Sequence, residues 1–459
     1  MKGSTGAIAA EEQLEAAQAR PLTGRGWGLY LLLAVALVPI VNPMGSSQII
    51  FVDLINSAAL LVFACTVIVY RVRLRFPFAL PVFVALVGSV LAMSNAVSPP
   101  ASLMALLKDA YLYLWFVALV AVLQPRGALR GLRLAWVATA CFAALVVFVQ
   151  AAASGHLSLQ EMLIANRGQR ARAVGTFINP NMFADYLLFS IFMVLGLVNQ
   201  VRWRVLAPAL ALIVMALLST KSNGGLISVV AGLLVWALAG AWARGMSRHR
   251  MAGMAALGLG VVIASVWLHS ELGVGDALVQ RVGTLSYVGR ISDSSQQREH
   301  IWHRLEESYA RSPLGIGPKN SSEQTLGIGG RERQESFRSK EAHDDYLSFA
   351  VERGPLGLAG LLLGTWMAVA MVLRGRRQLD RRLGSAVAGG ALWAAFLGTL
   401  AASSVHSLVL EKLHFRHFWL FLAVVTAMCT EAVTTDSAPE RQRAPDLPGR
   451  ADVLPALHA

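Results

Sequence analysis

The sequence predicts an all-helical integral membrane protein with about twelve spanning helices and one large extracytoplasmic loop. Of its 459 residues, 55% are hydrophobic and 15% are charged, whereas a soluble domain carries about 25% charged residues. Apolar segments long enough to cross the hydrocarbon core, which takes about 20 residues, recur along the chain. Basic residues gather in alternate connections, a pattern typical of the cytoplasmic side of a membrane protein.

Twelve apolar segments are predicted to span the membrane. Their limits are 26–41, 49–70, 76–94, 109–124, 134–153, 182–200, 203–219, 224–242, 251–269, 354–373, 386–404 and 417–432. The first is short, and Lys108 and Asp109 interrupt the start of the fourth, so the number of spans is approximate.

The connections rich in arginine set the predicted orientation, because Lys and Arg accumulate in short cytoplasmic loops. They lie at 71–75, 126–133, 202–204, 244–250 and 374–382. We therefore expect a multi-pass protein of the bacterial inner membrane with both termini in the cytoplasm. The predicted organisation is a cytoplasmic tail (1–25), nine spans (26–269), a periplasmic loop (270–345), three spans (346–432) and a second, disordered cytoplasmic tail (433–459).

Charge and cysteine usage exclude two classes of ligand. The net charge of +13 resides mostly in the short basic loops, so topology explains it and we expect no nucleic acid partner. Cys65, Cys141 and Cys429 each lie inside an apolar span, where packing is their expected role. None lies near a His pair with metal-ligand spacing, so we predict no metal and no other cofactor.

The long loop contains one amphipathic helix, predicted over 296–311. Trp302, Leu305 and Tyr309 repeat at helical spacing and form an apolar and aromatic stripe with Arg298 at its head. The arginine either binds a ligand or covers the stripe with its aliphatic stem.

His343 closes the loop, at the outer end of a helix predicted to descend into the tenth span. Asp344 and Asp345 follow it directly. A histidine beside carboxylates at a membrane boundary is typical of a general base, since the unperturbed imidazole pKa is about 6.5. Taken alone, this residue is equally well interpreted as a histidine that lies at the membrane interface without a catalytic role.

Two further outward connections contain candidate binding residues. Arg172 ends a basic cluster, 166–172, that has no acidic partner on the outer side, and it is predicted to bind an anion. Asn179 and Asn181 flank a proline, a pattern that also begins helices. Lys221 is the only charge in the turn 219–225 and either contacts an anion or snorkels.

Several motifs together resemble one family. They are Gly175-Thr176-Phe177 with Asn179-Pro180-Asn181 and Ala184, the turn Ser222-Asn223-Gly224, Arg298 with Trp302, Ser312-Pro313-Leu314-Gly315-Ile316-Gly317-Pro318, Ala342-His343 with Tyr346-Leu347, and Glu352-Arg353-Gly354. In their order and topology, over residues 26–432, they resemble the O-antigen ligase and O-antigen polymerase superfamily.

This resemblance implies a C-type glycosyltransferase fold with its active site at the outer face, beneath the large loop. Such enzymes transfer a glycan from undecaprenyl diphosphate to a hydroxyl of lipid A-core, a growing glycan or another glycan acceptor, with membrane lipid around the site. They use no nucleotide sugar, and the ligases need no metal.

The resemblance also assigns site residues. The family's loop arginine and closing histidine correspond to Arg298 and His343. The turn after the seventh span usually has Ser-Arg-Gly, but Asn223 stands at the arginine position, so Lys221 either substitutes for that cation or the contact is lost. Asp344 stands where relatives often have Asn or Gln.

The chemistry independently fits these residue types. Departure of a diphosphate builds negative charge, so the site needs fixed cations, which Arg298, Arg172 and Lys221 can supply. The acceptor hydroxyl needs a base, for which His343 is the candidate.

Two other classes of function remain. A transporter would also have twelve spans, but its ionisable residues should lie near the midplane, whereas Asp53 and Asp185 lie nearer the outer ends of their spans. A non-catalytic envelope assembly protein would need neither His343 nor Arg298. Within the family, the sequence leaves ligase, polymerase and protein-targeted transfer open.

Overall fold

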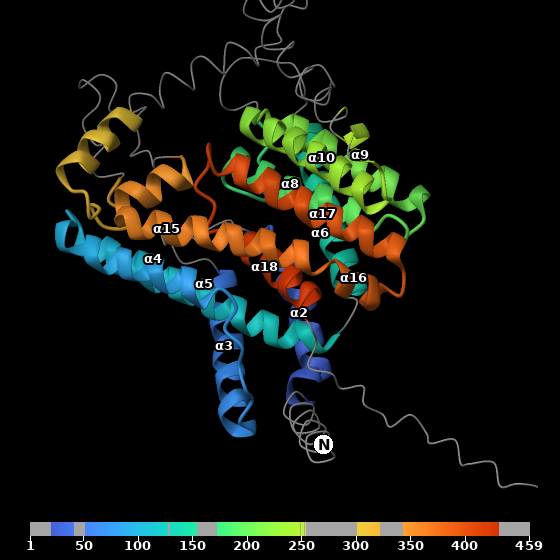
Figure 1. Cartoon of the computed structure of the whole chain (residues 1–459), viewed down its shortest axis with the longest axis horizontal. Helices are drawn as coiled ribbons and strands as arrows, with labels where there is room; N and C mark the ends of the chain where they lie inside the picture. The colour runs from blue at the N-terminus through green and yellow to red at the C-terminus, as the bar shows by residue number, and fades with distance from the viewer. Residues whose placement is uncertain are drawn as a thin grey trace, which may run out of the picture.

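The structure is a computed structural model and describes residues 20–40, 51–126, 129–153, 172–247, 249–251, 253, 301–321 and 343–430. Within these ranges all regular elements are helices, apart from one isolated bridge between Val198 and Val201 (Figure 1). Seven of the described helices are long and apolar enough to cross a membrane, and four shorter ones are also apolar. The prediction of an all-helical membrane protein is therefore confirmed.

The structure describes these apolar helices in chain order. They are α2 (Arg25–Leu37), α3 (Phe51–Tyr70), α4 (Ala79–Ala92), α5 (Pro99–Leu123), α6 (Arg130–Ala153), α8 (Pro180–Gly196), α9 (Trp203–Thr220), α10 (Asn223–Ala243), α15 (Asp345–Arg374), α17 (Ala386–His406) and α18 (Arg416–Cys429). The connections include the 3-10 turns η1 (Arg20–Thr23), η2 (Met93–Asn95) and η3 (Gln124–Arg126), and the polar helix α16 (Arg376–Leu383).

Two helices begin earlier than the apolar pattern predicts. Helix α5 begins at Pro99, and Lys108 and Asp109 therefore lie within it. Proline suits the first turn of a helix because that turn needs no N–H donor. Helix α15 begins at Asp345 because Asp344 caps it. Its first turns are polar, so hydropathy alone did not include them in the predicted span.

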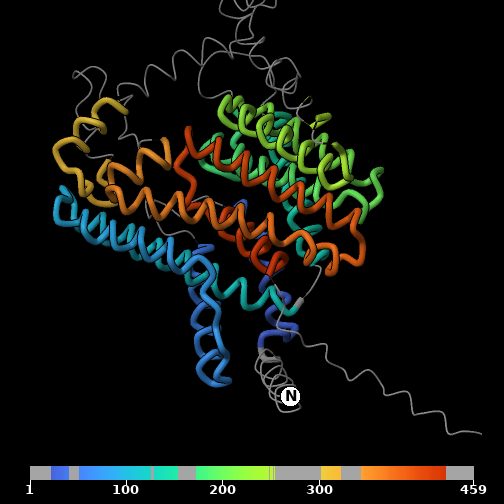
Figure 2. Tube along the Cα trace, viewed as in Figure 1, coloured from blue at the N-terminus to red at the C-terminus, as the bar shows by residue number. Residues whose placement is uncertain are grey.

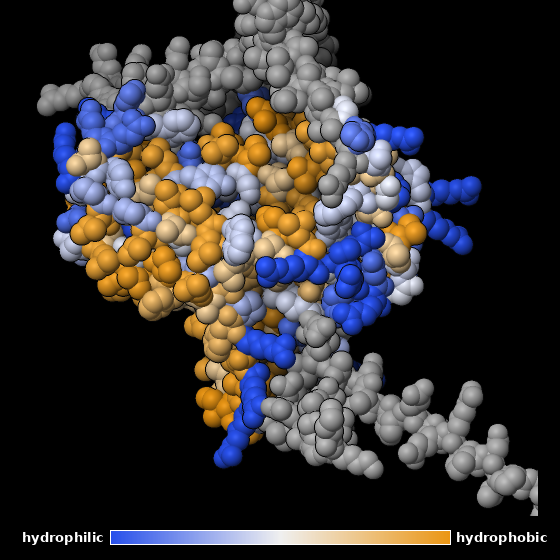
Figure 3. Space-filling model, in the orientation of Figure 1, coloured by the Kyte–Doolittle hydropathy of each residue, from blue (hydrophilic) through white to orange (hydrophobic). Residues whose placement is uncertain are grey.

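The core is a set of closely packed helices. Helix α17 packs against α10, α8 and α16, and α4 packs along α15. Glycines allow these approaches: a Cβ on Gly232 would meet the Gly398 carbonyl at 2.6 Å, and one on Gly360 would meet the Pro81 carbonyl at 2.7 Å. Helix α3 instead projects away from the bundle (Figures 1 and 2). In the view of Figure 3, hydrophobic residues cover much of the face over α4 and α15.

Helix α15 is kinked at the Glu352-Arg353-Gly354 motif. Gly354 has a φ of 67° and is followed by Pro355. Leu314 crosses the helix there, because a Cβ on Gly354 would meet the Leu314 carbonyl oxygen at 2.5 Å, and the Ile316 N–H donates to the Val351 carbonyl over 2.9 Å. The glycines of the 312–318 motif thus let the loop lie directly on the kink.

The described part of the amphipathic helix, residues 301–311, packs on α15. Ile301 and Leu305 form a small buried cluster with Ile316 and Val351, and Trp302 and Tyr309 pack against it. The predicted stripe therefore faces α15, and the tube of Figure 2 shows this helix beside α15.

Several predicted features lie outside the described residues. They are the ninth span (251–269, apart from 251 and 253), Arg298, the basic cluster up to residue 171, most of the N-terminal tail and the whole tail 433–459.

Candidate active site

His343 does not belong to the helix that follows it. It has a left-handed backbone with a φ of 53°, and its N–H donates to Oε1 of Glu411 over 3.2 Å. Asp344 is the N-cap of α15, since its carboxylate accepts from the N–H groups of Tyr346 and Leu347. The expectation that His343 begins the helix is therefore wrong. A non-glycine residue in this conformation costs about 1–3 kcal/mol, and such residues cluster at functional sites.

The loop between α17 and α18, residues 407–415, organises this end of the bundle. Asp345 binds it at three points: its N–H donates to the Ser407 carbonyl, while its carboxylate accepts from the Ser407 hydroxyl at 2.8 Å and the Lys412 N–H at 3.1 Å. The loop thereby holds Glu411 against His343.

Asp185 anchors both ends of the same loop. It is fully buried and accepts from Nδ1 of His406 at 2.6 Å and Nε2 of His417 at 2.7 Å. Lys412 lies 4.0 Å from the same carboxylate and donates to the carbonyl of Ser403. Burial lowers the pKa of Lys412, and the carboxylates of Asp185 and Asp345 oppose this lowering.

Segment 318–321 lies beside His343. Lys319, also left-handed with a φ of 63°, places its ammonium 4.0 Å from Glu411, and its N–H donates to Glu352 over 2.9 Å. Asn320 ties the segment to α5: its Oδ1 accepts from the Ser98 N–H, and its amide donates to the Ser102 hydroxyl at 2.7 Å.

The other predicted binding residues form a second group. The Arg172 guanidinium donates to the Thr220 carbonyl at 2.9 Å and to Oδ1 of Asn181 at 2.8 Å. Asn179 caps α8 as predicted, accepting from the Asn181 N–H. Lys221 is left-handed and only 5% exposed. The structure thus brings Arg172, Asn181 and the Lys221 turn together.

The α17–α18 segment lies between the two groups of site residues. Glu411 in this segment contacts His343 and Lys319. On the other side, the turn after Lys221 packs on the segment, because a Cβ on Gly224 would lie 2.4 Å from Val409 and 3.6 Å from the His406 ring. All the described candidates therefore lie at one end of the bundle.

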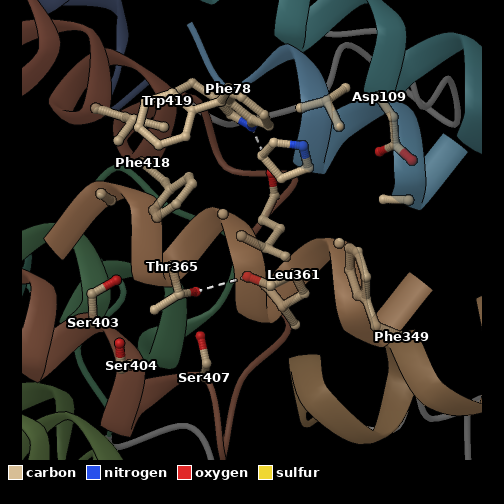
Figure 4. Close-up of a pocket in the computed structure, with 18 of the residues that line it drawn as sticks. Phe78, Asp109, Phe349, Leu361, Thr365, Ser403, Ser404, Ser407, Phe418 and Trp419 are labelled. Carbon is tan, nitrogen blue, oxygen red and sulfur yellow. Dashed lines mark hydrogen bonds between the residues drawn. The ribbon is translucent and has the colours of Figure 1, made fainter. Parts of the chain in front are cut away.

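An apolar groove of about 140 Å³ runs along α15 from this end. At this end the lining includes Tyr346, Phe349, Asp109, Ser403, Ser404 and Ser407, all of which except Tyr346 are labelled in Figure 4. Farther along α15 the lining is largely apolar and comes from α4, α15, α17 and α18: Phe78, Pro81, Val82, Ala85, Leu86, Gly360, Leu361, Gly364, Ala368, Leu400, Phe418, Trp419 and Leu422. The groove therefore has a polar end near His343 and an apolar remainder.

One buried ion pair lies on the groove wall. Arg353 contacts Asp109 at 2.7 Å and Ser89 at 3.0 Å, with its guanidinium over the Phe349 ring. This pair explains why Asp109 is tolerated inside α5. The arginine of the Glu352-Arg353-Gly354 motif thus holds α4 and α5 to α15.

Residues 208–362 match the model of the O-antigen ligase family. This match confirms the resemblance found in the sequence. The matched segment includes the turn at Lys221, the 312–318 motif, His343 and the α15 kink. The contacts among these motifs described above therefore lie within the matched segment. No curated protein matches the chain.

Sequence reasoning missed the residues on the C-terminal side of the family segment. His406, Glu411, Lys412 and His417 all fall outside the match, although a cluster of ionisable residues between two apolar segments marks them in the sequence. Within the described residues, no group of three or more His, Cys, Asp or Glu side chains is arranged to hold a metal ion.

Proposed function

We propose that this O-antigen ligase-type membrane protein is a glycosyltransferase that transfers a glycan from undecaprenyl diphosphate to an acceptor hydroxyl at the periplasmic face. The observation that carries the proposal is the position of His343, held against Glu411 beside the polar end of a long apolar groove.

The groove suits the lipid part of the donor. A polyprenyl chain is apolar and unbranched except for methyl groups. Its binding is favourable wherever the groove removes its surface from water or replaces its contacts with lipid. The groove follows α15 from Tyr346 as far as Ala368, so a chain within it would leave its diphosphate at the His343 end.

The reaction then needs a base and fixed cations. The His343 imidazole accepts the proton of the acceptor hydroxyl while the acceptor oxygen bonds to the anomeric carbon. The bond from that carbon to the diphosphate oxygen breaks, and undecaprenyl diphosphate leaves with the electron pair. Arg298, Arg172 and Lys221 are the candidates for stabilising the charge that develops on the leaving group, and Asn179, Asn181 and Asp344 hold the surrounding backbone.

Left-handed backbones at three candidate positions support this assignment. His343, Lys319 and Lys221 all have φ between 53° and 63°. Each of these residues lies where two segments meet, so their side chains are aimed by tertiary contacts, a feature typical of functional sites.

The experiment that tests the function uses purified protein in proteoliposomes with a lipid-linked glycan, once alone and once with lipid A-core. A shifted lipid A-core band indicates a ligase, and chain growth without added acceptor indicates a polymerase. Neither product, together with uptake of a solute by the same proteoliposomes, would contradict the enzyme and favour the transporter.

A further inference from the structure

Lys108 is an exposed cation within a spanning helix. It lies nine residues after Pro99, or about 14 Å along α5 at 1.5 Å per residue. Within the described residues it makes no ion pair, and its neighbour Asp109 is already bound by Arg353 at 2.7 Å. A charge at membrane depth is costly, and such residues usually serve a ligand or pathway.

Two further cations lie near Lys108. Lys319 and Arg416 both repel its ammonium, and Asp53 and Asp109 attract it. Arg416 is paired with Asp53 at 2.5 Å, and Lys319 is 38% exposed with its ammonium 4.0 Å from a carboxylate oxygen of Glu411. These three residues, the mouth cations, therefore gather positive charge in one region.

Three observations place the mouth cations beside the groove. Asn320 binds Ser98 and Ser102 and thereby holds Lys319 over α5, the helix of Lys108. Arg416 begins α18, and the same first turn of that helix supplies Phe418 and Trp419 to the groove wall (Figure 4). Asp109, adjacent to Lys108, also lines the groove.

The position of the family's turn arginine carries no charge in this chain. Asn223 stands at that position, Lys221 is 5% exposed, and two donors of Arg172 are directed to Thr220 and Asn181. The more accessible described cations next to the groove are Lys108 and Lys319.

We propose that Lys108, Lys319 and Arg416 bind the diphosphate of the lipid-linked donor, with its polyprenyl chain continuing into the groove along α15. A diphosphate would relieve the mutual repulsion of the mouth cations and accept charge-assisted hydrogen bonds from all three. The contact of Lys319 with Glu411, which also binds the His343 N–H, would bring this anion close to the proposed base.

This inference rests on the proposed function, so its test measures binding without transfer. Undecaprenyl diphosphate would be titrated into purified protein in detergent, and the dissociation constant measured for the wild type and Lys108→Gln/Lys319→Gln. Arg311→Gln is the matched control, because Arg311 is a cation in the same described loop segment, is 80% exposed and pairs with Glu307 on its own helix. We expect at least a tenfold weaker affinity for the double variant and no change for the control.

Comparison ligands identify the source of the phosphate. Undecaprenyl monophosphate should bind more weakly than the diphosphate, and phosphatidylglycerol should not compete. If phosphatidylglycerol competes equally, the mouth cations are a general lipid headgroup site and the proposal is wrong. Equal affinity of wild type and double variant would also overturn it.

Two controls keep this outcome separate from the enzyme assignment. Lys108→Arg/Lys319→Arg, which retains both charges, should restore binding and so exclude misfolding as the cause of the loss. If the wild type transfers glycan and the double variant binds undecaprenyl diphosphate normally, only the role of the mouth cations is refuted. If the wild type transfers no glycan but its binding of undecaprenyl diphosphate requires both lysines, only the glycosyltransferase function is refuted.

Discussion

The backbone N–H of His343 donates to the carboxylate of Glu411 over 3.2 Å, although the two residues are 68 positions apart in the chain. This bond joins the end of the large loop to the connection between α17 and α18. It also holds His343 in a conformation that a non-glycine residue adopts only under tertiary constraint. Glu411 is therefore a positioning residue for the proposed base.

Replacement of Glu411 should lower the rate of glycan transfer. Glu411→Ala removes the acceptor for the His343 N–H and the partner of Lys319, so we expect a fall of at least tenfold in kcat with normal membrane expression. Glu411→Gln keeps an acceptor oxygen and should restore most of the rate.

The pH profile separates positioning from a merely structural role. Glu411→Gln removes a negative charge near His343, which favours the neutral imidazole, so the acid limb of its rate profile should move to lower pH. The charged groups around His343 in the described residues also include Lys319, Asp344, Asp345 and Lys412, and these are unchanged. A wild-type rate in Glu411→Ala would refute the positioning role.

Loss of Asp185 should destabilise the whole end of the bundle that holds the α17–α18 loop. Asp185→Ala leaves His406, His417 and Lys412 buried without their common carboxylate. Breaking a buried ionic group in this way costs about 3–5 kcal/mol. Asp380→Ala is the control, because Asp380 pairs with Arg376 at a 29% exposed site, where pairs contribute about 1 kcal/mol or less. We expect a clearly lower melting temperature for the first variant only.

The sequence predicted the helices far better than the site. Hydropathy identified the apolar segments because the bilayer imposes a length and composition on each one separately. Sequence patterns also identified the Asn179 cap and the stripe on residues 301–311, because both depend only on residues close together in the chain. The contacts of Asp185 with His406 and His417 were not predicted, because these histidines lie 221 and 232 residues away along the chain and no local pattern pairs them with Asp185.

The start of α15 shows the same limit in a single helix. Asp344 and Asp345 suggested a charged pair beside a histidine, whereas Asp344 is a cap and Asp345 binds the α17–α18 loop. Adjacent residues at a helix terminus point in different directions, so their partners depend on the tertiary fold. Sequence proximity to His343 was therefore a poor guide, and Glu411 contacts it instead.

Alanine at Gly354 should release the loop from the α15 kink. An alanine there would have to adopt the left-handed backbone of Gly354, and its Cβ would lie 2.5 Å from the Leu314 carbonyl oxygen. Gly384→Ala is a matched control, since Gly384 has a φ of 61° but nothing lies within 4 Å of a Cβ there. The control should lose about 1–2 kcal/mol from backbone strain alone, and Gly354→Ala more. Protease cleavage within the loop, compared between the two variants, measures the release.

Opposite ends of α15 should face opposite sides of the membrane. In a protein without its native cysteines, Glu307→Cys should react with an impermeant thiol reagent in intact spheroplasts, because Glu307 is 60% exposed on the helix within the predicted periplasmic loop. Arg377→Cys, on α16 beside the basic connection, should react only after lysis. Ser321 is a poor labelling site, since it is buried and bound to Glu352. Reaction of Arg377→Cys in intact spheroplasts would reverse the orientation.

The proposed base should be essential for transfer and dispensable for donor binding. General-base assistance contributes about 10² to 10⁴-fold, so His343→Ala should lose a comparable factor in rate while its affinity for undecaprenyl diphosphate stays within about twofold of the wild type. His303→Ala is the control, because His303 is a 69% exposed histidine on the same loop and lies 3.5 Å from Glu306 on its own helix. The wild-type rate should also fall toward acid pH, because a protonated imidazole cannot accept the hydroxyl proton. Chelators should leave the rate unchanged, and inactivation by a chelator with recovery on adding metal would contradict a metal-free reaction. A wild-type rate for His343→Ala would mean that another group accepts the proton, and the assignment of His343 would be wrong.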